Sequence, residues 1–182
     1  IWNVRREVVR PAKHIDNPLI VADRPWEDKG VGGGYTLFDE QQQIFKMWYN
    51  VFNYVAWRNE EDHCYTYWIC YAESKDGLSW VKPELGIIEY EGSKNNNLVL
   101  QGEWWATIGT VLKEMDEEDP ARRYKMLYTD VFDMLTRETV AEAGAIDSEW
   151  TGRSGVCLAY SADGIHWQPY AGNPVIDGES DT

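Results

Sequence analysis

Hydrophobic and polar residues alternate with a period of two in several short stretches of this sequence, a pattern typical of β-strands. In the first half the predicted strands cover residues 34–38, 44–50, 65–71 and a short stretch that ends near Val81. The same order returns in the second half at residues 108–113, 124–129 and 155–160. Helical periodicity is weak, and a short helix is predicted only at 133–145. The pattern therefore predicts an all-β chain.

The strands belong to an internal repeat. The segment at 45–49, FKMWY, returns 79 residues later as YKMLY at 124–128. A Ser-x-Asp-Gly-x-x-Trp phrase begins at Ser74 and again at Ser161, 87 residues later, so the second copy carries an insertion between the two matches. The two predicted copies cover about 31–82 and 105–170.

The geometry of a tight turn explains the Ser-x-Asp-Gly-x-x-Trp motif. Asp accepts backbone N–H bonds within a loop and Gly adopts a positive φ, so the pair closes a tight hairpin while the Trp packs across its base. We therefore interpret Asp76 and Asp163 as turn formers rather than catalysts, and we assign His166, inside the second turn, a structural role.

Repeated four-stranded units predict a β-propeller of antiparallel blades. Two blades cannot close a ring, and the sequence stops at 178–182, where a third copy is expected to begin. We therefore expect residues 1–182 to be one incomplete propeller region of a longer chain, its remaining blades supplied by the rest of that chain or by another subunit. Three successive glycines at 32–34 lack the Lys-Ser/Thr of a phosphate loop and predict crowding of the innermost strands around the propeller axis.

The composition of the chain restricts the classes of partner that we expect it to bind. The chain has 17 basic and 31 acidic side chains, a formal net charge of −14, which disfavours nucleic acid and anionic membranes. No apolar run approaches the length of a membrane span. The three cysteines and three histidines show no metal-ligand spacing, so we expect free thiols, no metal and no cofactor. Ten Trp and eleven Tyr suit half-exposed strands and sugar-binding surfaces alike.

Four stretches of the sequence resemble the five-bladed β-propeller glycoside hydrolase superfamily of arabinanases, xylosidases and fructosidases, in particular bacterial members of unassigned activity. These stretches are residues 71–85, 95–97, 124–126 and 161–167. The resemblance implies that acidic residues near the start of the innermost strands point into a central funnel. One of them would act as nucleophile or base, one would tune the pKa of its neighbours, and a Glu would be the general acid.

Three acids precede predicted innermost strands at nearly the repeat spacing, and they are the candidate catalytic residues: Glu27, Glu103 and Asp181. Asp23 and Asp28 remain rivals of Glu27. The candidate substrate-binding residues are their neighbours Asp23, Arg24, Trp26, Asp28, Trp104, Trp105 and Thr182. Arg24 suits a carboxylated sugar or an ordinary ion pair. Asp130 and Asp133, beside the inserted loop, either reach the mouth of the funnel or lie in solvent, and solvent is the expectation.

The leading hypothesis is a glycoside hydrolase that acts on a carbohydrate through paired carboxylates. A non-catalytic carbohydrate-binding propeller and a protein-interaction scaffold are the alternatives, because a fold by itself does not determine function.

Overall fold

The computed structural model describes residues 7–56, 63–103, 106–132 and 153–178 of the chain. These residues form two antiparallel β-sheets and two single-turn 3-10 helices, η1 (Pro25–Glu27) and η2 (Pro120–Arg122), with no α-helix among them. The all-β prediction is confirmed, whereas the helix predicted at 133–145 lies outside the described residues. In the part of the chain that is described, no helix is long and apolar enough to cross a membrane.

The first sheet follows the order of the sequence. Its strands are β1 (Val31–Asp39), β2 (Ile44–Ala56), β3 (His63–Ser74), β4 (Trp80–Val81) and β5 (Leu98–Leu100). Strands β1, β2, β3 and β4 pair in that order, and β5 pairs with β3.

The second sheet repeats this plan. Its strands are β6 (Thr107–Lys113), β7 (Tyr124–Phe132), β8 (Arg153–Ser161), β9 (Gln168–Pro169) and β10 (Ile176–Asp177). Strands β6, β7 and β8 pair in order, and both β9 and β10 pair with β8. The sequence repeat is therefore a structural repeat of five strands, and the two short strands β5 and β10 are additions that periodicity did not predict.

Corresponding residues occupy corresponding places in the two sheets. Phe45 pairs with Ser74 across β2 and β3, and Tyr124 pairs with Ser161 across β7 and β8. Asn97 donates its side-chain amide to the Tyr71 carbonyl at 2.6 Å, and Asn173 makes the equivalent bond to Leu158 at 3.0 Å. The asparagine bonds tie the loop before the fifth strand to the third strand in each repeat.

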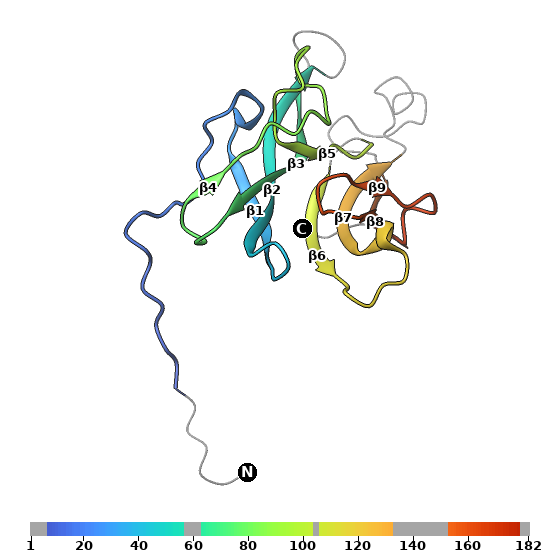
Figure 1. Ribbon diagram of the computed structural model, residues 1–182. Coiled ribbons are helices and arrows are strands. Elements are labelled where there is room, and N and C mark those ends of the chain that lie inside the picture. Colours follow the sequence, from blue (N-terminus) through green and yellow to red (C-terminus); the bar gives the residue numbers. More distant parts are fainter. Residues whose placement is uncertain (1–6, 57–62, 104–105, 133–152, 179–182) are drawn as a thin grey trace.

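The two sheets lie side by side, with β1 next to β6 (Figure 1). Alternate side chains of β2, including Trp48, point toward the second sheet and meet Tyr124 and Met126 in a shared core. The opposite face of the first sheet buries Tyr49 and Val51 beneath the N-terminal segment and the loop after β4. The described strands form no closed barrel.

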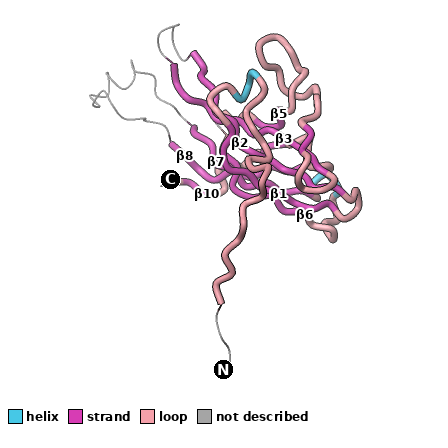
Figure 2. Tube along the Cα trace, turned by 90° about the vertical axis from the view of Figure 1, so that its left-hand side faces the viewer, coloured by secondary structure: helices cyan, strands magenta, loops and turns pink. Residues whose placement is uncertain are grey.

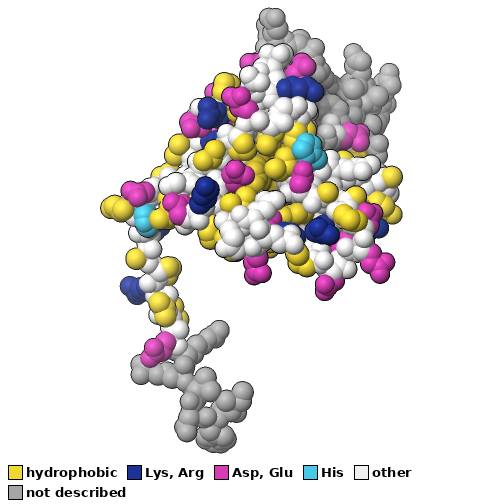
Figure 3. Space-filling model, viewed as in Figure 1, with side chains coloured by type: hydrophobic (Ala, Val, Ile, Leu, Met, Phe, Trp, Pro, Cys, Tyr) yellow, Lys and Arg dark blue, Asp and Glu magenta, His cyan; other side chains and the backbone are white. Residues whose placement is uncertain are grey.

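The N-terminal residues 7–16 lead away from both sheets as an exposed, extended segment (Figures 1 and 2). On the face seen in Figure 3, hydrophobic side chains gather in the middle and charged side chains surround them.

The glycine-rich start of β1 allows the close packing that the sequence predicted. A Cβ added at Gly34 would lie 2.5 Å from the Trp48 carbonyl oxygen, and one at Gly32 would lie 2.7 Å from the Phe52 ring. These glycines let β1 lie close against β2 of its own sheet, at a point where the pairing register shifts. Close packing is therefore confirmed for Gly32 and Gly34, and crowding around a propeller axis stays a prediction.

The Asp-Gly turns are confirmed as hairpin closures. Asp76 accepts the backbone N–H groups of Leu78 and Ser79 at 2.8 and 2.7 Å. In the second turn Asp163 accepts those of Ile165 and His166 at 2.8 and 2.9 Å. The His166 ring also contacts Asp163, at 2.8 Å, as its structural role predicts. Gly77 and Gly164 have φ of +74° and +80°, which only glycine adopts without strain.

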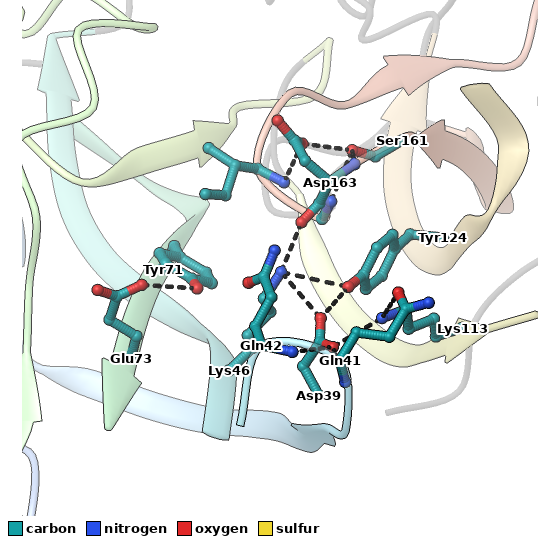
Figure 4. Close-up of polar contacts among 12 residues, drawn as sticks. Asp39, Gln41, Gln42, Lys46, Tyr71, Glu73, Lys113, Tyr124, Ser161 and Asp163 are labelled. Carbon is teal, nitrogen blue, oxygen red and sulfur yellow. Dashed lines mark hydrogen bonds and ion pairs between the residues drawn. The ribbon is translucent and has the colours of Figure 1, made fainter. Parts of the chain in front are cut away.

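A buried polar network joins the two sheets (Figure 4). The Lys46 ammonium lies 3.3 Å from Asp39 and donates to the Asp163 carbonyl at 2.8 Å and the Tyr124 hydroxyl at 3.2 Å. Asp39 also accepts hydrogen bonds from the Tyr124 hydroxyl and, at 2.7 Å, from Lys113. Burial raises the pKa of Asp39, but the hydrogen bonds from Lys113 and Tyr124 outweigh it, so the pKa falls below its usual range. Asp39 is therefore ionised at neutral pH.

Candidate functional site

A pocket of about 460 Å³ opens between the two sheets, beside the segment that follows β5. The first sheet contributes the end of β5 and residues 101–103, and the second contributes β7 and the loop around β9. The residues that line it are Ile87, Ile88, Val99, Leu100, Gln101, Gly102, Glu103, Tyr128, Asp130, Phe132, Trp167, Pro169, Tyr170 and Asn173.

Two carboxylates line this pocket in different environments. Glu103 is exposed, whereas Asp130 is only 2% exposed. Asp130 accepts the backbone N–H of Glu103 at 2.6 Å and that of Val131 at 2.8 Å. The expectation that Asp130 sits in solvent is wrong, because these backbone donors hold its carboxylate inside the protein. Asp130 thereby positions the backbone that carries Glu103.

Aromatic side chains form much of the remaining wall. Tyr128 is buried, Tyr170 is half-exposed, and Trp167 is exposed to an intermediate degree. The Trp167 indole nitrogen is buried and has no hydrogen-bond partner among the described residues. Asn173 accepts the Leu158 backbone N–H at 2.8 Å, which fixes its side chain beside the pocket. The wall thus combines ring faces with a few polar groups, as ligand pockets usually do.

The thiol and phenol behind the pocket stay protonated at neutral pH. Burial, with the charge of Asp130 as a further cause, raises the pKa of Cys157 to about 11. Burial and the neighbouring Cys157 and Asp130 raise the pKa of Tyr128 as well. Cys157 is therefore unsuited to act as a thiolate nucleophile. Cys157 and Cys70 are free thiols, as expected, and both are buried. The side chain of Cys64 is not among those that the structure describes.

Glu27 lies outside this pocket, in η1, and is completely buried. One carboxylate oxygen accepts the Tyr49 hydroxyl at 2.7 Å. The other accepts the Lys82 ammonium at 2.7 Å and the backbone N–H groups of Asp23 and Arg24 at 2.9 and 3.2 Å. These contacts tie the N-terminal segment to the first sheet. They assign Glu27 a structural task, and its predicted catalytic role stays a prediction.

The neighbours of Glu27 also make contacts within the protein. The Trp26 indole donates to Asn97 at 2.8 Å and packs edge-on against Tyr90. Arg24 lies 3.6 Å from Asp23, so the ordinary ion pair is the arrangement observed. Asp23 also accepts a hydrogen bond from Lys82, which lowers the pKa of its carboxyl, and Asp28 pairs with Lys29 at 2.6 Å.

Four predicted site residues, Trp104, Trp105, Asp181 and Thr182, lie outside the described residues. Of the predicted acids that the structure describes, Glu103 lines the pocket between the sheets, whereas Asp23, Glu27 and Asp28 do not.

Among the pocket residues that sequence reasoning missed are Tyr128, Trp167, Tyr170 and Asn173. Repeat position offered a signal for Asn173, because Asn97 holds the corresponding place in the first repeat. Among the described residues, no three His, Cys, Asp or Glu side chains come together in a group able to hold a metal ion.

Comparison with known proteins adds no relative. No protein-family model, no curated protein and no solved structure matches this chain.

Proposed function

We propose that this chain is part of a β-propeller and binds a carbohydrate in the pocket beside Glu103. The observation that carries the proposal is the composition of that pocket, an exposed carboxylate facing a wall of aromatic side chains. Ring faces pack against the C–H faces of sugars, while carboxylate and amide groups bind hydroxyls. The repeat of two five-stranded sheets, packed side by side, supports their assignment as neighbouring blades.

Hydrolysis is the chemistry that we propose for this site. Glycoside hydrolysis needs one carboxylic acid to protonate the leaving oxygen and one carboxylate to attack or to activate water. Glu103, exposed in the pocket, is suited to contact a glycosidic oxygen. Asp130 and the predicted Asp181 are the candidates for the second carboxylate.

Non-catalytic binding is the second candidate function, and one observation favours it. Asp130 is almost completely buried and its two oxygens accept backbone N–H groups. In that arrangement Asp130 supports the loop rather than reaching a ligand. A binding site without a complete pair of acids would hold a glycan and leave it intact.

Glycan-array binding together with an assay of reducing-sugar release tests the proposal. Glu103→Gln should lower turnover by about 10²–10⁴-fold while binding persists, because the amide keeps the shape but neither donates nor accepts the reacting proton. Glu118→Gln, at an exposed acid outside the pocket, is the matched control and should change neither. Tyr170→Ala should weaken binding.

The outcomes separate the candidates. Binding with sugar release that depends on Glu103 supports hydrolysis, and binding without release supports the non-catalytic alternative. If no glycan binds, or if Tyr170→Ala and Glu103→Gln leave binding and turnover unchanged, the assignment of this pocket is wrong.

A further inference from the structure

The interface between the two repeats has two unlike sides. The first repeat supplies Asp39, Lys46 and Trp48, which we call the lysine side. The second repeat supplies Lys113, Tyr124 and the Asp163-Gly164 turn, which we call the turn side. Lys46 donates to the Asp163 carbonyl at 2.8 Å (Figure 4), and Trp48 donates to the Gly164 carbonyl at 2.7 Å. The Lys46 ammonium lies 4.9 Å from the centre of the Tyr124 ring.

Each repeat contains both sides, so one of each has no such contact among the described residues; we call these the unused sides. In the second repeat the lysine side consists of Glu114, Lys125 and Leu127, and an ion pair joins Lys125 to Glu114 as one joins Lys46 to Asp39. In the first repeat the turn side consists of Phe38, Phe45 and the Asp76-Gly77 turn. The strand registers establish this equivalence, since Phe38 pairs with Phe45 as Lys113 pairs with Tyr124.

Both unused sides expose apolar side chains. On the unused lysine side Leu127 is 39% exposed and its neighbour Leu112 is 52% exposed. On the unused turn side Phe38 is 41% and Leu78 45% exposed. Surfaces of this kind are typical of interaction sites.

The acid on the unused lysine side differs from Asp39 in its need for a second cation. Within the chain, Asp39 requires Lys113 as well as Lys46 to balance its buried charge. On the unused turn side Phe38 replaces Lys113 and supplies no cation. On the unused lysine side Glu114 has a counter-ion within its own repeat, Lys125, which also contacts Glu117 at 2.6 Å. Glu114 is 47% exposed whereas Asp39 is completely buried, so Glu114 does not need a cation from the unused turn side. Joining the unused sides would therefore bury no unpaired acid of the Asp39 kind.

The hydrogen-bonding groups of the two unused sides are matched to each other. Within the chain the Gly164 carbonyl accepts the Trp48 indole, and the indole of its own turn, Trp167, has no described partner. In the unused turn Trp80 itself donates to the Gly77 carbonyl, at 3.2 Å. The residue that would face this carbonyl is Leu127, whose side chain has no N–H group and so needs no acceptor. The loss of an indole donor at Leu127 on one unused side is thus accompanied by the indole donor of Trp80 on the other.

We propose that the lysine side of the second repeat, Glu114, Lys125 and Leu127, binds the turn side of the first repeat of a second copy of this chain. In this contact Leu127 packs on Gly77 and Phe45, and Lys125 reaches the Asp76 carbonyl and the Phe45 ring. The association is head to tail, so it leads to a closed ring or to a longer assembly. It depends on the geometry of the repeat and not on carbohydrate binding.

Two single substitutions and their mixture test the proposal by sedimentation or light scattering. Wild-type chain should gain mass with concentration up to about 1 mM, at salt of about 0.15 M or above to screen the charge of −14 on each copy. Leu127→Glu removes one side and Phe38→Glu the other, so each variant alone should be monomeric. Their equimolar mixture retains one intact contact and should form one-to-one dimers and nothing larger.

Val9→Glu, at an exposed residue of the N-terminal segment, is the matched control and should associate like the wild type. Circular dichroism establishes that every variant is folded, which is expected because the substituted side chains are at least partly exposed. A monomeric wild type, association that survives either substitution, or a mixture of variants that stays monomeric would each overturn the proposal.

Discussion

The Trp48 indole N–H donates to the Gly164 carbonyl oxygen at 2.7 Å, joining β2 of the first repeat to the turn of the second. The two residues are 116 positions apart, and both are buried at the contact. A local turn that recurs within the sequence thus also forms part of the contact between the two repeats.

Trp48→Phe tests the contribution of this bond. The substitution keeps an aromatic ring but leaves the Gly164 carbonyl without its indole donor, so we expect a loss of about 1–3 kcal/mol in the free energy of unfolding. Trp80→Phe removes an indole bond to the Gly77 carbonyl that lies within one partly exposed turn, and it should cost less. Urea unfolding of both variants makes the comparison, and equal losses would contradict a special role for the inter-repeat bond.

Gly164→Ala and Gly77→Ala separate backbone strain from packing. Both glycines have positive φ, so each substitution carries a similar conformational cost of about 1 kcal/mol. A Cβ at Gly164 would also lie 2.9 Å from the Trp48 ring, whereas one at Gly77 meets Phe45 at 3.6 Å. We expect the larger loss of thermal stability at Gly164, and the reverse order would show that the sheets do not meet here.

The Asp39–Lys46 pair should show strong coupling in a double-mutant cycle. Lys46→Met leaves Asp39 with Lys113, while Asp39→Asn leaves two buried lysines facing each other. We expect each single variant to lose about 2–4 kcal/mol and the double variant to lose less than their sum, because it removes both buried charges. Denaturant titration measures the cycle, and simple additivity would mean that the pair is not coupled.

Glu27→Gln should behave as a stability variant. The amide cannot neutralise Lys82, whose side chain is 8% exposed, and it disturbs the bonds to Tyr49 and the Asp23 backbone. We expect a loss of about 2 kcal/mol in thermal unfolding. Glu89→Gln, at an exposed acid, serves as the control. Unchanged stability would remove the structural explanation and return Glu27 to the catalytic candidates.

Acid should weaken the second turn in a defined range of pH. Burial raises the pKa of Asp163, but hydrogen bonds from His166, Ile165 and Ser161 outweigh it and lower the pKa to about 2. A carboxyl with a lowered folded pKa stabilises the protein above its unfolded pKa, and this contribution is lost as the pH falls from about 4 to about 2.

Because Asp163 is partly exposed, we expect its contribution to be about 1 kcal/mol. Asp163→Asn keeps an acceptor oxygen without the charge, so the stability difference from the wild type should shrink over this range. A difference that stays constant with pH would contradict the assignment.

The sequence by itself determined the all-β class, the repeat and the two hairpin turns. These features are local, since strand periodicity and the Asp-Gly turn depend on residues a few positions apart. The short strands β5 and β10 were not predictable in this way, because two or three residues carry no clear period.

Only the tertiary structure decided which acids are buried and which reach a pocket. Equal spacing suggested that Glu27 and Glu103 point into one funnel, yet Glu27 is enclosed by Tyr49 and Lys82 while Glu103 is exposed. Likewise Asp130 is buried because a loop distant in sequence donates to it, and Trp48 finds its acceptor in the other repeat. The physical reason is that burial and hydrogen bonding depend on how the two sheets pack, and this packing cannot be inferred from the spacing of residues along the chain.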